Sequence, residues 1–261
     1  MIEVTGINKT FNWGSPNQIY ALRNIGLKMD EGEFVTIIGS NGAGKSTLLN
    51  LLAGVFLPDT GSIKIVDRNV TGWAEHQRAK LIGRVFQDPL RGTAASMTIE
   101  QNLAMALLRG QRRGLALGVN GKARSLFREQ LAQLNLGLEN RLASKVGLLS
   151  GGQRQALTLL MATITKPRVL LLDEHTAALD PGAGELVSQL TAKIVRENGL
   201  TTLMVTHNMA QALAMGTRTF MMHQGQVIFD ARGEERAGLT VSNLIARFAA
   251  IMDDKALLTR N

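Results

Sequence analysis

Hydrophobic residues recur along this chain with two different spacings, which together predict an alternation of strands and helices. Continuous apolar runs at 34–38, 169–172 and 201–205 predict buried strands, and such runs are typical of the centre of a parallel sheet. Helical spacing predicts helices at 46–53 and around 186–194, each followed by a glycine that would end it. Strands that alternate with helices in this way predict an α/β fold.

Towards the N-terminus the pattern changes to strands with few helices between them. Stretches at 2–9, 20–29 and 62–66 predict three strands, separated by clusters of turn residues. A helix is then predicted at 74–82, followed by a short strand at 84–86.

The middle of the chain, residues 90–166, shows helical patterning only. Thr98 and Gln101 fit a capping box that opens one helix, and a single apolar face over 124–135 predicts another. The stretch 109–122 is rich in glycine and basic residues, which predicts a basic loop. A third apolar helix, ending near residue 164, completes this segment.

The C-terminal part predicts a hairpin and one more helix. Strands at 219–222 and 226–229 are joined through Gln224 and Gly225, which favour a tight turn. A short amphipathic helix at 241–250 then precedes a polar tail.

Composition narrows the classes of protein that fit this pattern. Of the 261 residues, 45% are hydrophobic and 19% are charged, which is typical of a globular chain. No apolar run is long enough for a transmembrane helix, and the N-terminus does not resemble a secretory signal. The chain has no cysteine, so disulfides, thiolate catalysis and cysteine metal sites are excluded.

The formal net charge of +8 leaves three interpretations open. They are nucleic-acid binding, proximity to an anionic membrane surface, and binding of a polyphosphate. Only 4% of residues are aromatic, which argues against a base-stacking surface, and no DNA- or RNA-binding motif is recognisable. We therefore expect no nucleic-acid partner.

The stretch 39–47, GSNGAGKST, matches G-x-x-x-x-G-K-[ST] and lies between a predicted strand and a predicted helix. Its glycines let backbone N–H groups wrap a phosphate chain, and the start of the helix favours the same anion. Lys45 would reach the β- and γ-phosphates of a nucleotide, and the Ser46 hydroxyl would bind Mg²⁺. The predicted nucleotide-binding residues of this loop are Gly39, Ser40, Asn41, Gly42, Ala43, Gly44, Lys45, Ser46 and Thr47.

Two further stretches carry candidate chemistry. The apolar strand at 169–172 ends in Asp173 and Glu174; Asp173 would complete the Mg²⁺ shell, and Glu174 could orient or deprotonate a water. The sequence Leu149-Ser-Gly-Gly-Gln153 precedes an apolar helix. Ser150 could cap that helix, and the glycines after it could bind a second phosphate; alternatively, the stretch is only a capping turn.

Taken in order, these motifs resemble those of ATP-binding cassette (ABC) ATPases. GSNGAGKST, LSGGQ, LLLDE and the loop that ends at Asp180 occur in the family's order, and the resemblance extends from residue 2 to about 248. It implies a P-loop NTPase of RecA-like fold with an antiparallel β subdomain and an inserted helical subdomain. The implied division is a core at 1–89 and 167–235, a helical signature subdomain at 90–166, and a C-terminal helix and tail at 236–261.

The resemblance also implies roles for other residues. Gln87 resembles the glutamine that senses the γ-phosphate, binds the metal and meets a membrane partner, and His207 resembles the switch histidine. Phe11 resembles the aromatic residue that stacks on adenine, although Trp13 and Tyr20 are near enough to compete for this role. The expected ligands are therefore ATP and Mg²⁺.

The same resemblance implies a head-to-tail dimer. Ser150, Gly151, Gly152 and Gln153 of one copy would contact the ATP held by the P-loop of the other. ATP would close this dimer and hydrolysis would reopen it, while Asp180 would lie at the contact between the two copies.

The chain also departs from the family pattern at two positions. His175 and Ala177 stand where the family usually has proline and serine, and neither change touches an atom assigned to the chemistry.

Three functions are compatible with a single cassette that carries no fused permease. The first is an importer ATPase at the cytoplasmic face of the membrane, since LSGGQRQALTLLMA and DEHTAALDP resemble a bacterial subgroup. That subgroup is paired with permeases of the branched-chain amino-acid type and with solute-binding proteins, which implies amino acids or related small solutes as cargo. The alternatives are an exporter ATPase and an ATPase without a transport role.

Overall fold

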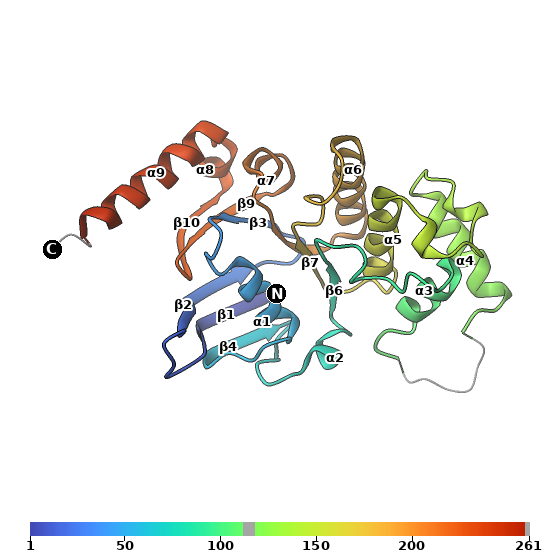
Figure 1. Ribbon diagram of the computed structural model, residues 1–261, viewed down its shortest axis with the longest axis horizontal. Coiled ribbons are helices and arrows are strands. Elements are labelled where there is room, and N and C mark those ends of the chain that lie inside the picture. The colour runs from blue at the N-terminus through green and yellow to red at the C-terminus, as the bar shows by residue number, and fades with distance from the viewer. Residues whose placement is uncertain (112–117, 259–261) are drawn as a thin grey trace.

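The computed structural model describes residues 1–111 and 118–258 as two sheets flanked by helices (Figure 1). The larger sheet has the strand order β10-β9-β3-β8-β7-β6, and all neighbouring strands are parallel except the edge pair β9 and β10. The central strands are apolar and buried on both faces, as the continuous apolar runs predict. The strands are β3 (Phe34–Gly39), β6 (Ile82–Val85), β7 (Val169–Asp173), β8 (Thr201–Val205), β9 (Arg218–His223) and β10 (Gln226–Arg232).

The smaller sheet is antiparallel and has the order β2-β1-β4-β5. Helix α1 (Lys45–Ala53) packs in one core with both sheets, and its Leu48, Leu49, Leu51 and Leu52 are buried there. This packing fixes the start of α1, and with it the P-loop, against the ends of the parallel strands. The strands are β1 (Ile2–Phe11), β2 (Ile19–Met29), β4 (Thr60–Ile65) and β5 (Arg68–Asn69).

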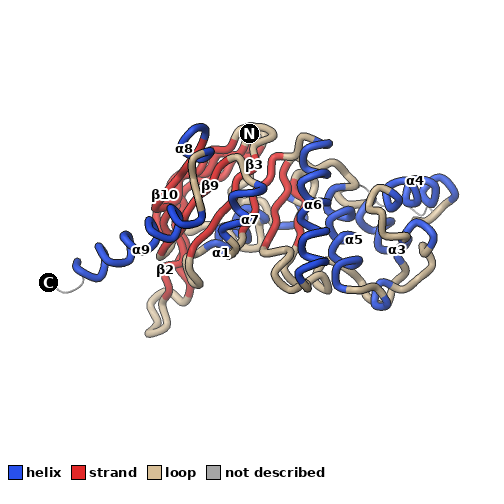
Figure 2. The backbone as a smooth tube through the Cα atoms, turned by 90° about the horizontal axis from the view of Figure 1, so that it is seen from above, coloured by secondary structure: helices blue, strands red, loops and turns tan. Residues whose placement is uncertain are grey.

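Helices α3, α4 and α5 form a helical group at one end of the large sheet, and α6 and α7 cover the face opposite α1 (Figures 1 and 2). The helical group shares a second core with α6 and with the apolar side chains of β7 and β8. Helix α5 therefore joins the helical group to the sheet. The remaining helices are α2 (Glu75–Arg78), α3 (Ile99–Leu107), α4 (Gly121–Ala132), α5 (Gly151–Thr163), α6 (Pro181–Asn198), α7 (Met209–Met215), α8 (Gly233–Ala237) and α9 (Val241–Leu258).

The fold confirms the predicted α/β class and corrects several boundaries. The helix predicted at 74–82 is only the short α2, and the strand predicted at 84–86 is β6, which begins at Ile82. Parallel pairing of Ile82 with Val169 draws this segment into the sheet in spite of its helical pattern. Helix α9 continues eight residues beyond the predicted end at 250, and α7 was not predicted.

The predicted loop at 109–122 is shorter than expected, because α4 begins at Gly121 with Asn120 as its N-cap. Residues 112–117 of that prediction, and the last three residues of the polar tail, lie outside the described part of the chain. Among residues 1–111 and 118–258, no helix is both long and apolar enough to cross a membrane.

Candidate functional site

The P-loop leaves β3 at Gly39 and enters α1 at Lys45. Gly44 is the N-cap of α1 with φ of 96°, and no side chain caps the helix. A Cβ atom on Gly44 would lie 2.5 Å from the carbonyl oxygen of Ala21, so both the backbone conformation and the space require glycine. The helix start is therefore open to an anion, as the sequence predicts.

Lys45 lies folded over this loop. Its Nζ atom donates to the carbonyl oxygens of Gly39 at 2.8 Å and Ser40 at 2.9 Å, and the residue is buried. Burial lowers the pKa of Lys45, while the nearby carboxylates of Glu174 and Asp173 oppose that shift. Both donor contacts are to neutral carbonyls, so a phosphate group is a stronger acceptor that the ammonium can turn to.

Ser46 and Asp173 bring two oxygen ligands together at the end of β7. The Ser46 hydroxyl donates to Asp173 Oδ1 at 3.4 Å, and Arg84 Nη2 lies 3.5 Å from Asp173 Oδ2. Burial raises the pKa of Asp173, and the Arg84 guanidinium counteracts this. Hydroxyl and carboxylate oxygens suit Mg²⁺, and the described residues contain no cluster of three acidic or histidine ligands to complete its shell. The pair therefore fits a Mg²⁺ whose remaining ligands come from phosphate and water.

Glu174 and His207 meet at the ends of neighbouring strands β7 and β8. His207 Nδ1 lies 3.4 Å from Glu174 Oε2, and the imidazole is largely exposed whereas the carboxylate is half-buried. Glu174 has φ of 44°, which is uncommon for a residue with a side chain, and its N–H donates to the carbonyl oxygen of Val205. The structure thus brings together two residues that are 33 positions apart in sequence.

A cavity of about 370 Å³ surrounds the P-loop and contains Glu174. Phe11 and Ile19 also line it, and Phe11 packs edge-on against Phe56. Of the three aromatic candidates, Phe11 alone lines this cavity, whereas Trp13 and Tyr20 are exposed side chains outside it. The remaining lining residues are Ala21, Asn41, Gly42, Ala43, Gly44, Lys45, Ser46 and Thr47.

The LSGGQ stretch forms the start of α5, away from the P-loop cavity. Ser150 is the N-cap, and its Oγ accepts from the Gln153 N–H at 3.3 Å while Gln153 Oε1 accepts from the Ser150 N–H at 3.2 Å. Gly152 lies against α6, where a Cβ atom would approach Ala183 Cβ to 2.8 Å. Residues 150–153 do not line the described P-loop cavity, so one chain does not place both motifs around one nucleotide.

Two other predicted residues lie apart from this cavity. Gln87 is exposed just after β6, and among the described residues no hydrogen bond joins it to Asp173 or to the P-loop. Asp180 is the N-cap of α6 and accepts from the Ala183 N–H at 3.0 Å.

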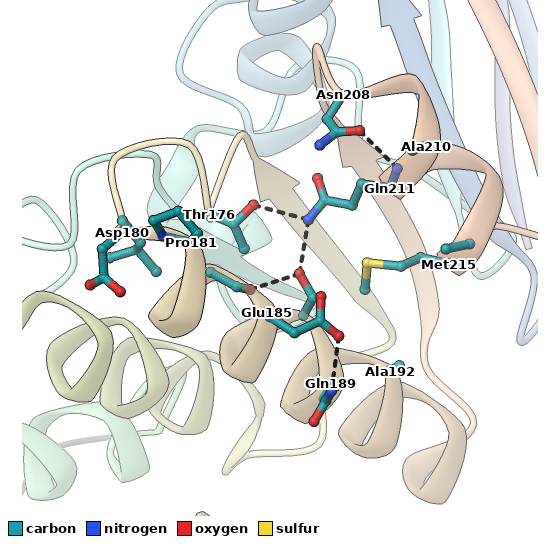
Figure 3. A pocket seen from close by; sticks show the side chains of 14 residues that line it. Thr176, Asp180, Pro181, Glu185, Gln189, Ala192, Asn208, Ala210, Gln211 and Met215 are labelled. Atoms are coloured by element: carbon teal, nitrogen blue, oxygen red, sulfur yellow. Dashed lines mark hydrogen bonds between the residues drawn. The ribbon is translucent and has the colours of Figure 1, made fainter. Parts of the chain in front are cut away.

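Gln211 is a site residue that the sequence reasoning missed. Its Nε2 donates to the hydroxyls of Thr176 at 2.9 Å and Ser188 at 3.0 Å, and its Oε1 accepts from Thr206 at 2.8 Å. Figure 3 shows this side chain extending from α7 to Thr176, where both residues line a cavity of about 600 Å³. Thr176 lies two residues after Glu174, and Thr206 directly precedes His207. Gln211 therefore links the loop that carries Glu174 to the loop that carries His207 by hydrogen bonds. A glutamine in a short helix gives no sequence signal of this kind.

Comparison with known families identifies the family of this chain. The profile described as ABC transporter matches residues 22–177, which is more than half of the chain. The chain belongs to the ABC transporter family. It is an ATPase subunit of this family.

Relatives and solved structures are similar along nearly the whole chain. The tyrosine transport ATP-binding protein of Clostridioides difficile is 44% identical over 250 residues, covering 95% of this chain and 98% of the relative. The lipoprotein-releasing system ATP-binding protein LolD of Nitratidesulfovibrio vulgaris is 34% identical, with 84% and 91% covered. The dimeric cassette MJ0796 bound to ADP and Pi has a TM-score of 0.76 and 31% identity, with 89% and 98% covered. These likenesses confirm the predicted ABC ATPase fold and ATP hydrolysis.

Proposed function

We propose that this ABC ATPase powers the import of amino acids or related small organic solutes through a separate membrane permease. The observation that carries the proposal is the 44% identity with a tyrosine transport ATP-binding protein. That similarity covers both chains almost end to end, so it includes the helical region as well as the nucleotide-binding motifs.

In the proposed site, each residue near the γ-phosphate has a separate role. Lys45 binds the β- and γ-phosphates, and Glu174 orients and deprotonates the attacking water while His207, 3.4 Å from it, contacts the γ-phosphate. Ser46 and Asp173 would hold Mg²⁺, with Gln87 as a further ligand, and the bound ion would supply positive charge against the phosphates. Phe11 stacks on the adenine at the open wall of the cavity.

A second copy of the chain completes each site. Ser150, Gly151, Gly152 and Gln153 lie outside the P-loop cavity of their own chain, so they serve the ATP bound by the partner copy. Support comes from the similar cassette MJ0796, which is a dimer with ADP and Pi bound. A homodimer with two equivalent sites is the simplest arrangement, because every motif is present in this chain.

A groove between the sheet and the helical group supplies a surface for the permease. It has a volume of about 490 Å³, and Phe86, Arg91, Met105 and Arg109 are among its lining residues. Phe86 directly precedes Gln87, so a permease helix in this groove would reach the ATP site through one loop. We place the protein at the cytoplasmic face of the membrane, where the net charge of +8 suits anionic lipids. A solute-binding protein delivers the cargo on the opposite side.

Reconstitution with the neighbouring permease tests the import proposal. The chain and the permease encoded beside it are placed in proteoliposomes with ATP inside, and uptake of labelled tyrosine and other amino acids is measured. We expect ATP-dependent uptake that requires the solute-binding protein outside. Transport of cargo only in the opposite direction, or no association with any permease, would contradict import.

The matched control is Glu174→Gln, which keeps every phosphate ligand but removes water activation. We expect this variant to bind ATP, to form a stable dimer and to hydrolyse roughly 10²–10⁴-fold more slowly. Size-exclusion chromatography with and without ATP measures the dimer. Hydrolysis at the parental rate would show that Glu174 does not have the proposed role.

The exporter alternative rests on a specific relative, since a LolD protein is 34% identical. In that case ATPase activity would be stimulated by a lipid-modified or other hydrophobic cargo instead of by a loaded solute-binding protein. The same proteoliposomes distinguish the two stimuli.

A further inference from the structure

Gln155 is a buried amide in the first half of α5 that contacts two distant loops. Its Nε2 atom donates to the carbonyl oxygen of Phe86 at 3.0 Å and to that of His175 at 2.6 Å. The residue is fully buried, and its Oε1 atom has no hydrogen-bond partner. Both N–H groups are therefore used to hold backbone from two other parts of the chain.

Each of these carbonyls is one residue away from a residue that serves the ATP site. Phe86 directly precedes Gln87, and His175 directly follows Glu174. A shift of either carbonyl moves the neighbouring residue, because the peptide units between them are planar and short. Gln155 thus reaches the two loops that face the γ-phosphate without touching the nucleotide itself.

The signature motif lies about one turn away, at the N-terminus of the same helix. Ser150 caps α5, and the helix runs without interruption from Gly151 to Thr163. A helix transmits displacement along its axis as a rigid element. Any movement of Ser150 towards a partner's phosphate is therefore carried to Gln155 and to the carbonyls it holds.

The catalytic segment after β7 is held from two sides. Gln155 bonds the carbonyl oxygen of His175 from the signature helix, and Gln211 bonds the hydroxyl of Thr176 from the side of His207. The His175 ring is itself fixed by Thr191 Oγ1 at 3.0 Å. Thr191 on α6 and Gln211 on α7 hold this segment from one side, and Gln155 holds it from the helical group.

We propose that Gln155 is a positioning residue that couples the two ATP sites of the dimer within one chain. Its helix presents the signature to the ATP held by the partner copy, while its amide sets Gln87 and Glu174 for the ATP held by its own P-loop. Occupation of one site then prepares the other, which is a coupling between two separate sites. The inference rests on the dimer of the proposed function and not on the identity of permease or cargo.

The test uses the full-length chain and Gln155→Met, which fills the same space without amide donors. ATPase rate is measured against ATP concentration, and nucleotide affinity of the monomer is measured separately by titration with a fluorescent ATP analogue. We expect a Hill coefficient well above one for the unsubstituted chain and close to one for Gln155→Met. Monomer affinity should stay within about twofold, since Gln155 is not a nucleotide ligand.

Thr163→Val is the matched control on the same helix. Its buried hydroxyl donates to the carbonyl oxygens of Leu159 and Leu160 within α5, so its loss removes a buried hydrogen bond without cutting a contact to the two loops. This variant should keep the Hill coefficient even where its melting temperature falls as far as that of Gln155→Met. Gln155→Leu, which is smaller and also lacks the amide donors, serves as the second variant if Gln155→Met does not fold.

Two outcomes overturn the coupling. One is a Hill coefficient of one in the unsubstituted chain, and the other is an unchanged Hill coefficient in the folded Gln155 variants. The dimer is checked separately with Glu174→Gln and ATP by size-exclusion chromatography. A monomer there contradicts the trans arrangement itself, whereas a dimer with unchanged cooperativity in the Gln155 variants contradicts only the role of Gln155.

Discussion

The P-loop helix α1 and the signature helix α5 both begin at glycine-containing motifs, but their N-termini differ. Helix α1 begins at Gly44 with no side-chain cap, so its first N–H groups are open to an anion. Helix α5 begins with a capping box in which Ser150 and Gln153 satisfy each other. The start of α1 can therefore accept an anion as it stands, whereas the start of α5 could contact a phosphate only by giving up part of its own cap. This difference favours ATP binding to the P-loop first and dimer closure second.

The largest expected effect comes from removing the charge at the P-loop. Lys45→Ala deletes the ammonium that now bonds Gly39 and Ser40, and with it the main positive charge directed at the phosphates. We expect ATP affinity of the monomer and turnover to fall by roughly 10²–10³-fold. Ser150→Ala is the paired variant, and titration of the monomer should show nearly unchanged affinity. Equal losses in the two variants would refute the difference between the two helix starts.

A smaller effect is expected on the pH dependence of stability, from the buried histidine His175, whose carbonyl oxygen bonds Gln155 of the signature helix. Burial lowers the pKa of His175 to about 4, from an ordinary value near 6.5 in the unfolded chain. Between these values the unfolded chain binds the extra proton, so stability is complete above about pH 6.5 and declines as the pH falls towards 4. The difference amounts to about 3 kcal/mol over that range.

Chemical denaturation at a series of pH values measures this dependence. His175→Gln should flatten the curve between pH 6.5 and 4, because it removes the group that titrates only on unfolding. The exposed His76→Gln is the control and should leave the curve unchanged. A curve for His175→Gln that follows the unsubstituted chain would show that His175 is not buried as a neutral group.

The smallest effect concerns the capping box itself. Gln153→Ala removes the acceptor for the Ser150 N–H, and loss of such a cap costs about 1 kcal/mol of stability. We expect a correspondingly small fall in melting temperature, together with ATP binding by the monomer that does not change. Asn120→Ala, which removes the cap of α4 outside the site, is the control for a purely structural loss. A large fall in monomer affinity in Gln153→Ala would contradict the proposed action in trans.

The sequence predicted those parts of the site whose geometry is set locally. The strand, loop and helix around Lys45 were predicted because glycines at fixed spacing determine that turn, and Ser150 was predicted as a cap for the same reason. Gln155 and Gln211 were not, because an amide within a helix has no local pattern that reveals its partners. Phe86 is 69 positions before Gln155, and only the packed fold brings the two together.

The wrong boundary of the helix predicted at 74–82 also arises from a contact that is distant in sequence. Ile82 has the spacing of a helix, yet it pairs with Val169 at the edge of the sheet, so a contact distant in sequence decided its structure.

The ion pair between Arg84 and Asp173 bears on the order in which the ligands of this enzyme arrive. The guanidinium lies 3.5 Å from the carboxylate that is offered to Mg²⁺, and it also donates to Asn50. Arg84 already balances part of the charge of Asp173, and Ser46 adds a single hydroxyl oxygen, so this pair offers little to a free hydrated ion. A metal that comes already bound to the phosphates of ATP brings the missing oxygens with it. We therefore expect the resting subunit to bind the nucleotide together with its metal, and not the bare ion first.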